Sequence, residues 1–170
     1  MLNPKTLGSI ALLFVAFVPF ENAAAQSDMP RVHVFGEDDS ESMRECQLSH
    51  DIAVATVESV LRYNRIGLAS RDDYQAQQAI AAYVNLNAIR DRYDTGRVGS
   101  FCSASIRFSL RSIAAVPNPA TGAQHVANIV YCEKGSLLSW EAVGLQARVN
   151  ETLRNFVNAC LSEYEEYRLR

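Results

Sequence analysis

The sequence predicts an α+β domain in which two N-terminal helices, a long antiparallel β-hairpin and a long C-terminal helix are joined by two disulfides. Apolar residues recur at three- and four-residue steps over residues 42–64, 70–93 and 139–164, which is typical of helices. Apolar and polar residues alternate strictly over residues 101–113, which is typical of a half-buried strand. The chain has 170 residues, of which 48% are hydrophobic and four are cysteines, so one stable domain is expected.

The first 25 residues have the features of a secretory signal peptide. Lys5 provides the positive start, residues 7–18 are apolar and uncharged, and residues 23–25 are three alanines, small enough for signal peptidase. An apolar run of about 12 residues spans roughly 18 Å as a helix, which is less than the hydrocarbon core of a membrane. An uncleaved anchor is the alternative. We expect cleavage, and a periplasmic or secreted bacterial protein without a membrane span after it.

The segment 26–42 is polar and acidic, and we expect a flexible lead-in, to which a short strand at 31–35 could be added. A single domain is expected over residues 43–170. Its first helix should begin at Ser42, because Ser42 followed by Glu45 forms a capping box. A second helix should begin after Ser70 and run to about residue 93.

The strand at 101–113 should pair with residues 126–132, because the segment between them is rich in proline, asparagine and glycine. A lone hairpin is only marginally stable in water, so the helices should cover its apolar face. The last helix is expected from about Ser139 or Trp140 to Tyr164.

All four cysteines, Cys46, Cys102, Cys132 and Cys160, follow the predicted cleavage site. An even number in an exported chain predicts two disulfides, because the destination is oxidising. We expect Cys102 to face Cys132 across the hairpin, and Cys46 to meet Cys160 where the first and last helices pack. Other connectivities remain open. The absence of Cys-x-x-Cys and of paired zinc-knuckle spacing argues against a redox or zinc site.

No catalytic, metal or cofactor motif stands out in the sequence. The three histidines, His33, His50 and His125, lie in separate elements without metal-ligand spacing, so no metal is expected. Ser49 and Asp51 flank His50, but neighbours on a helix diverge by about 100°, so these three residues do not form a triad. No phosphate-binding glycine loop or dinucleotide fingerprint is present, so no cofactor is expected.

The polar face of the first hairpin strand is the candidate binding surface. Arg107 and Arg111 are four residues apart in a strand, so they should point the same way about 13 Å from each other, with Ser105 and Ser109 beside them. The planar fork of arginine suits an acidic partner or a glycan. An ordinary solvated sheet face is the alternative.

These observations favour an exported binding protein without catalytic activity, such as an inhibitor, neutralising or chaperone-like partner of another exported protein or envelope component. A small envelope-acting hydrolase with His50 or His125 as general base is one alternative, and a structural subunit of an envelope assembly is another. The net charge of −3 argues against a nucleic-acid partner, which normally requires a clustered basic excess. The oligomeric state is left open.

Overall fold

The computed structural model describes residues 29–92 and 98–168, so the predicted signal peptide lies outside the described residues. Four strands form one sheet in the order β1 (Val32–Gly36), β2 (Ile80–Arg92), β3 (Val98–Pro117) and β4 (Gln124–Glu141). The helices are α1 (Glu41–Glu45), α2 (His50–Tyr63), α3 (Arg71–Gln75) and α4 (Ala142–Arg168). The expected mixture of helices and strands is therefore confirmed, although the elements differ in part.

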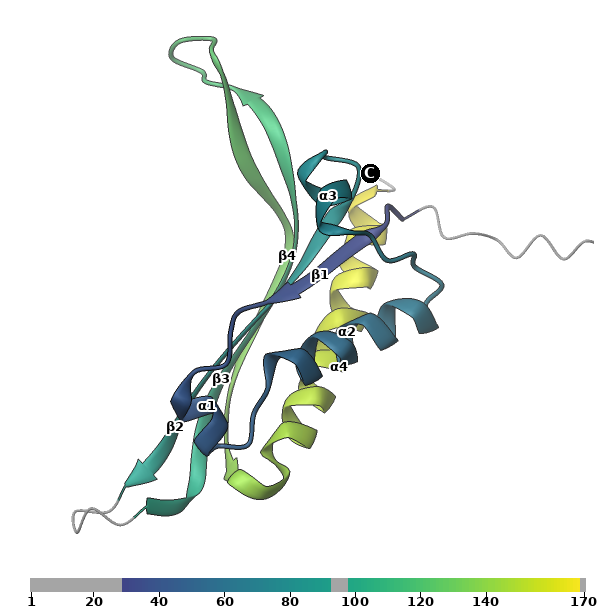
Figure 1. The fold of residues 1–170 in the computed structure, drawn as a ribbon. Helices are drawn as coiled ribbons and strands as arrows, with labels where there is room; N and C mark the ends of the chain where they lie inside the picture. Colours follow the sequence, from purple (N-terminus) through teal and green to yellow (C-terminus); the bar gives the residue numbers. More distant parts are fainter. Residues whose placement is uncertain (1–28, 93–97, 169–170) are drawn as a thin grey trace, which may run out of the picture.

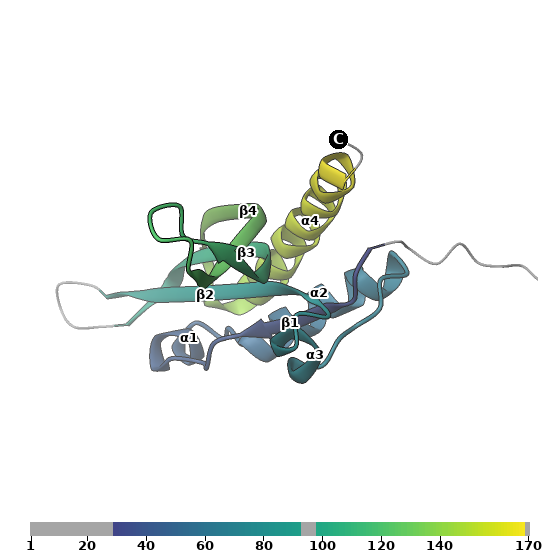
Figure 2. The same cartoon turned by 90° about the horizontal axis from the view of Figure 1, so that it is seen from above.

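Helices α2 and α4 lie on the same face of the sheet, as Figures 1 and 2 show. Strand β1 runs parallel to β2, and the connection between them carries α1, α2 and α3. The pairs β2–β3 and β3–β4 are antiparallel. Long β strands on one side and two long helices on the other enclose a single core.

The core is built by the alternation of side chains along the strands. Every second residue of β3 from Cys102 to Leu110 is buried against the helices, and Phe108 is fully enclosed. Leu145, Val149, Leu153 and Val157 form the buried stripe of α4 that covers these strands. Among the described residues, no helix is long and apolar enough to cross a membrane.

Residues 80–92, expected as part of a second helix, form β2 instead. The residues Ile80, Ala82, Val84, Leu86 and Ala88 are buried at a two-residue period, which only a strand can produce. The predicted start of this helix is nevertheless confirmed. Ser70 caps the short helix α3 in a capping box with Asp73, and the helix ends after one turn.

The first predicted helix is divided into α1 and α2. Gln47 adopts a positive φ of 56°, which interrupts the helical path between them. Ser40, rather than Ser42, caps α1 by accepting a hydrogen bond from the Met43 amide. Part of the expected lead-in is also built into the fold, because Val32 and Val34 of β1 are buried in the core.

The hairpin is longer than predicted. Its pairing extends from Phe101 opposite Glu141 to Pro117 opposite Gln124, with one register shift next to Tyr131. Helix α4 consequently begins only after Glu141. Gly144 takes a φ of +93° near its start, a conformation that side chains rarely adopt, and separates the first turn from the rest.

Two disulfides are present, but the pairing that we expected is wrong. Cys46 of the α1 C-cap is bonded to Cys102 of β3, and Cys132 of β4 is bonded to Cys160 of α4. In the hairpin register Cys102 lies opposite Trp140, and Cys132 lies opposite Leu110, so these two cysteines are far apart along the strands. Each disulfide therefore joins the helical layer to the sheet.

Candidate functional site

The long helices α2 and α4 leave the opposite face of the sheet uncovered (Figure 1). We call it the open face. By strand alternation it carries the odd-numbered residues of β1, β2 and the body of β3. They include His33, Phe35, Ala81, Tyr83, Asn85, Asn87, Ile89, Ser103, Ser105, Arg107, Ser109 and Arg111.

Aromatic rings gather on the open face at the end nearest α3. The His33 ring stacks on Phe35 with 5.6 Å between centroids, and Phe35 lies 5.1 Å from Tyr83. Helix α3 adds Tyr74, whose ring is 6.1 Å from that of His33. Together with Arg111, these four residues form what we call the ring cluster. It joins β1, β2, β3 and α3.

Arg111 packs over the ring cluster. Its guanidinium carbon lies 4.3 Å from the Tyr83 centroid and 5.2 Å from that of Phe35, which is cation–π geometry. Within the described part of the chain, no carboxylate forms a salt bridge with Arg111, and its Nε is buried without a hydrogen-bond partner. Arg111 is therefore held by ring faces, and no described carboxylate forms an ion pair with it.

A cleft of about 770 Å³ opens beside the ring cluster. Its walls come from β1, α3 and the upper part of β3, and they include Phe35, Tyr74, Arg71, Arg111 and Ile113. Asp38 also lines it, so the two arginines outnumber the one carboxylate. The cleft combines apolar ring surface with a local positive charge.

The hydroxyl of Tyr83 anchors one border of the cluster. It donates a hydrogen bond to Glu37, and it accepts one from Asn85 Nδ2 at 3.1 Å. The bond from Tyr83 lowers the pKa of Glu37 below its ordinary value, against the opposing effect of burial. Burial first, and the bond to Glu37 second, raise the pKa of Tyr83. Tyr83 therefore stays a neutral donor that fixes its ring.

The four residues of the predicted binding surface lie on the open face, but in two different environments. Arg111 belongs to the ring cluster, and Ser109 is only 5% exposed. Arg107 and Ser105 are exposed farther down β3, where Arg107 Nε lies 3.4 Å from Glu133 Oε1. Their role in binding stays a prediction. The strand pattern that predicts these four residues contains no signal for their neighbours Phe35, Tyr74 and Tyr83.

His50 is held as a structural residue of the fold. It is 3% exposed, its Nε2 accepts a hydrogen bond from the Leu86 amide at 3.1 Å, and its Nδ1 lies 3.2 Å from Asp39 Oδ1. The pairing of β1 with β2 ends at Gly36 opposite Val84, so β1 provides no partner for the Leu86 amide. The His50 ring accepts the hydrogen bond from this amide instead. Both ring nitrogens are therefore occupied within the fold.

Asp39 holds the N-terminus of α2. Its Oδ1 accepts a bond of 2.7 Å from the His50 amide and also faces the His50 ring. Burial acts to raise the pKa of Asp39, but the bonds from the His50 amide and from the Ser49 and His50 side chains outweigh it, so the pKa is lowered. The ionised carboxylate thus stabilises the folded state.

This linkage predicts an acid-dependent effect of Asp39→Asn. Because the folded-state pKa lies below the ordinary value of 3.8, the carboxylate contributes stability above that pH and loses it as the pH falls through the folded-state value. The variant should be less stable than wild type at pH 6, and the difference should shrink below pH 3.8. Urea unfolding across this range measures it, with Asp38→Asn as control. A difference that grows towards acid pH would contradict the assignment.

His125 lies at an exposed position of β4, opposite Val116, where it makes no hydrogen bond or ion pair with a carboxylate or hydroxyl of the described residues. Residues 29–92 and 98–168 contain no group of three or more His, Cys, Asp or Glu side chains that could hold a metal ion. The hydrolase alternative, with His50 or His125 as general base, stays a prediction.

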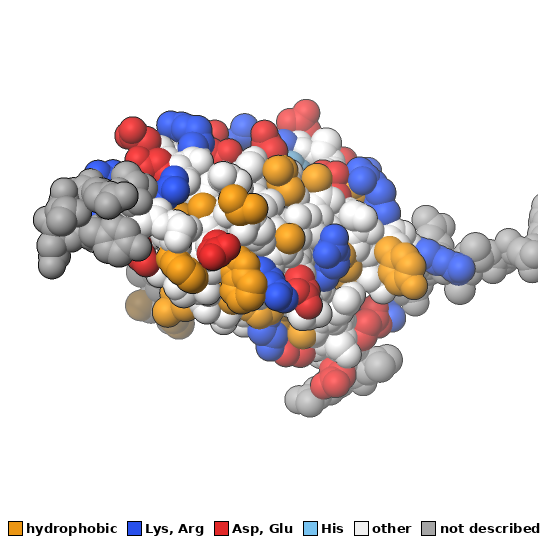
Figure 3. Space-filling model, turned by 90° about the horizontal axis from the view of Figure 1, so that it is seen from below, with side chains coloured by type: hydrophobic (Ala, Val, Ile, Leu, Met, Phe, Trp, Pro, Cys, Tyr) orange, Lys and Arg blue, Asp and Glu red, His pale blue; other side chains and the backbone are white. Residues whose placement is uncertain are grey.

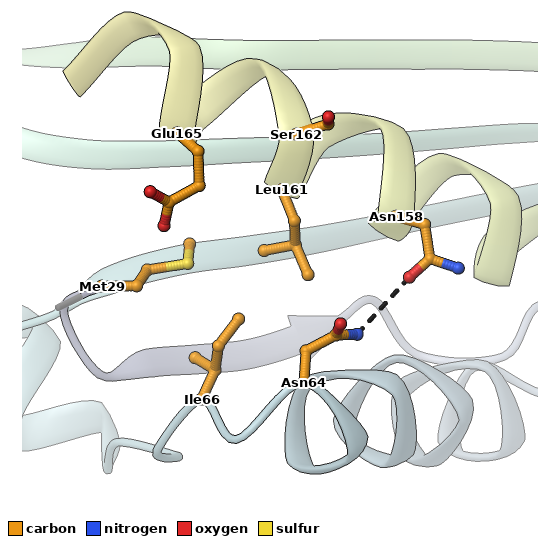
Figure 4. Close-up of a pocket in the computed structure, with 7 residues that line it drawn as sticks. All are labelled: Met29, Asn64, Ile66, Asn158, Leu161, Ser162 and Glu165. Carbon is orange, nitrogen blue, oxygen red and sulfur yellow. Dashed lines mark hydrogen bonds between the residues drawn. The ribbon is translucent and has the colours of Figure 1, made fainter. Parts of the chain in front are cut away.

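A second hollow of about 400 Å³ lies between the C-terminal ends of α2 and α4 (Figure 4). Met29, Ile66 and Leu161 form its apolar floor, and Glu165 stands at its border. Asn64 Nδ2 donates to Asn158 Oδ1 at 3.4 Å across the gap. This hydrogen bond links the two helices across the hollow. We therefore interpret the hollow as a gap in the packing between α2 and α4.

Charge is mixed on the lower end of the molecule. Figure 3 shows acidic and basic side chains interspersed there, with apolar groups between them and no continuous field of one sign. On this end, long-range electrostatic attraction of a strongly charged partner has no obvious basis.

The fold and the disulfides define a class. Disulfides persist in oxidising compartments and are rare in the cytosol, so the chain is an exported, disulfide-bonded α+β protein.

No protein-family model and no curated protein matches the chain. Among solved structures, rare lipoprotein B from Shewanella oneidensis is similar at a TM-score of 0.40 and 10% identity, over 82% of this chain and 96% of that one. A PelC dodecamer from Paraburkholderia phytofirmans is similar at a TM-score of 0.38 and 10% identity, over 80% and 89%. Neither similarity is close enough to indicate a function for this chain.

Proposed function

We propose that the chain is a periplasmic or secreted bacterial binding protein that holds a segment of another exported protein on the open face of its sheet. The cleft beside the ring cluster supports this proposal, because half-buried aromatic rings lie there beside two arginines that form no salt bridge with any described residue. Binding sites typically combine apolar walls with a few polar groups that fix orientation.

The lining favours a segment with an aromatic or aliphatic side chain next to a carboxylate. The ring of Tyr74 offers an apolar wall on the side of α3, and Phe35 forms the floor. Arg71 is exposed at the border, and it carries no salt bridge to any described residue. Arginine fits a planar carboxylate through two parallel hydrogen bonds, whereas the rings accept the apolar side chain.

A displayed library of random peptides tests the proposal. The oxidised protein should enrich peptides in which Asp or Glu stands beside Phe, Tyr, Trp or Leu. Tyr74→Ala and Arg71→Glu should each weaken binding of the enriched peptides by about 10- to 100-fold, since aromatic and arginine anchors dominate binding energies. Titration calorimetry with one synthetic peptide measures the loss.

Arg62→Glu provides the matched control for Arg71→Glu. Arg62 is an exposed arginine of α2, on the helical side of the molecule, and its change should leave peptide binding unaltered. Arg107→Glu tests whether the lower part of the open face contributes. Failure to enrich any peptide, or enriched peptides that bind Tyr74→Ala as well as wild type, would refute the proposal.

A further inference from the structure

The end of the β3–β4 hairpin extends past the rest of the sheet. Strand β3 has no partner in β2 beyond Arg111, so residues 112–117 and 124–130 form a two-stranded ribbon closed by the turn at 118–123. We call this segment the arm. It reaches beyond the end of α4 in Figure 1. Among the described residues no strand pairs with either edge of the arm.

The arm carries no charged side chain. The chain has no Asp, Glu, Lys or Arg from residue 112 to residue 132. Its side of β4 exposes apolar groups, since Val126 is 71% exposed and Val130 is 51% exposed. By their pairing with Ala115 and Arg111, both valines lie on the open-face side of the arm.

Charged residues protect the lower part of the outer edge of β4 from pairing with another strand, but none protects the part of the edge that lies in the arm. Exposed edge strands are usually protected from pairing by charges, prolines or bulges. Below the register shift at Tyr131, β4 carries Glu133, Lys134 and Glu141. Residues 124–130 carry none of these devices, so their backbone groups are available to a further strand.

We propose that a second copy of this chain pairs with the arm, β4 against β4 in antiparallel register about a two-fold axis at Asn128. In this register Val126 lies opposite Val130 of the second copy, and Val130 lies opposite its Val126. Four exposed valines then meet on one face. The same patch serves both copies, as a two-fold interface requires.

The distribution of charged residues along β4 favours the arm over the rest of β4 as the pairing segment, and a second copy over a lipid surface as its partner. Pairing about Asn128 brings no like charges together, whereas pairing centred on Leu137 would place Glu133 opposite Glu141 of the second copy. A lipid surface fits poorly, because the arm has no cation for headgroups and its two open edges would leave backbone groups unsatisfied in hydrocarbon. A second copy satisfies the β4 edge with backbone hydrogen bonds.

The dimer does not depend on the proposed binding of peptides. An axis perpendicular to the sheet joins two four-stranded sheets edge to edge, and it turns both open faces to the same side. Each cleft remains bounded by its own α3. Peptide binding and self-association can therefore succeed or fail separately.

Sedimentation velocity on the oxidised protein tests the pairing. In this register residues 126–130 of each copy pair within the arm, fewer than at a standard interface, so the measurement should cover roughly 5 to 500 µM. We expect the mass to rise from one chain to two. Val126→Glu/Val130→Glu should remain monomeric throughout, because glutamate then faces glutamate in both contacts.

The charge-paired variant Val126→Lys/Val130→Glu makes the register testable. Lysine then faces glutamate of the second copy at both contacts, and dimerisation should return and weaken with added salt. Leu137→Glu, at an 82% exposed position on the lower part of β4, should dimerise like wild type. Wild type that stays monomeric, or a charge-paired variant that stays monomeric while folded by circular dichroism, would overturn the proposal.

Discussion

Replacing Cys46 and Cys102 together by alanine should lower the free energy of unfolding by about 4 kcal/mol, because the disulfide closes a long loop in the unfolded chain. The two cysteines are separated by 56 residues in sequence. The disulfide also fastens the C-cap of α1 to β3, and both cysteines are fully buried. Urea unfolding of the oxidised double variant measures the loss.

Cys132→Ala/Cys160→Ala is the matched comparison. Its cysteines are 28 residues apart, so the expected loss in the free energy of unfolding is slightly smaller than that for the first disulfide. The mixed variant Cys46→Ala/Cys160→Ala should be worse than either, because it removes both native bonds and leaves Cys102 and Cys132 distant from each other. Non-reducing peptide mapping of wild type should recover Cys46 joined to Cys102. A Cys46–Cys160 peptide would show this connectivity to be wrong.

Phe108→Ala should lower the free energy of unfolding by about 3–5 kcal/mol, the range for removing a buried aromatic side chain. Phe108 is among the largest fully buried side chains, and it stands on β3 between the partners Val84 and Lys134. Chemical denaturation with unchanged slope would show a loss of stability alone.

Phe101→Ala is the control for this substitution on the same strand. Phe101 is 46% exposed, so its removal should cost less than about 1 kcal/mol. Equal losses for the two variants would mean that the inward face of β3 has been assigned incorrectly.

The type of an element can be predicted where its apolar residues follow one clear period, as in β3. In β2 the apolar residues fit both the two-residue period of a strand and the three- to four-residue steps of a helix, so the prediction there was wrong. In residues 102–110 of β3, apolar residues alternate strictly with serine and arginine, and the expected hairpin is confirmed in part, since both of its strands are longer than predicted. In β2, Ala81 and Ile89 occupy the outward positions and blur the alternation, so Ile80, Tyr83, Val84 and Asn87 also fit a helix. The inward series from Ile80 to Ala88 at two-residue steps was the signal for a strand.

The expected Cys102–Cys132 bond could have been excluded from the position of the turn. The sequence identifies the residues around 117–122 as the turn, and a tight antiparallel hairpin pairs residues at equal distances from its turn. Cys102 is then expected near residue 137 and Cys132 near residue 107, roughly three residues from their observed partners Trp140 and Leu110. The cysteines therefore had to bond to other elements. The tertiary positions of α1 and α4, which decide the partners, depend on packing that no local pattern contains.

The candidate site was predicted only in part. Alternation correctly places Arg107 and Arg111 on one face of the strand. It cannot show that Tyr74 and Phe35 reach the same place, because α3 and β1 come from distant parts of the chain. Reading residues 80–92 as a helix also hid Tyr83, since a strand at this point puts its ring next to Arg111.

The two disulfides also decide how the folded chain would respond to mechanical force. If residues 29 and 168 were pulled apart, tension would pass through each sulfur–sulfur bond and bypass the loops that these bonds close. Only residues 29–46, 102–132 and 160–168 could then lengthen, and the arm lies entirely within the middle stretch. Reduction would release the bypassed loops, at up to about 3.6 Å per residue. The oxidised chain therefore extends less under a pulling force than the reduced chain does. The arm lies in a segment that carries this force.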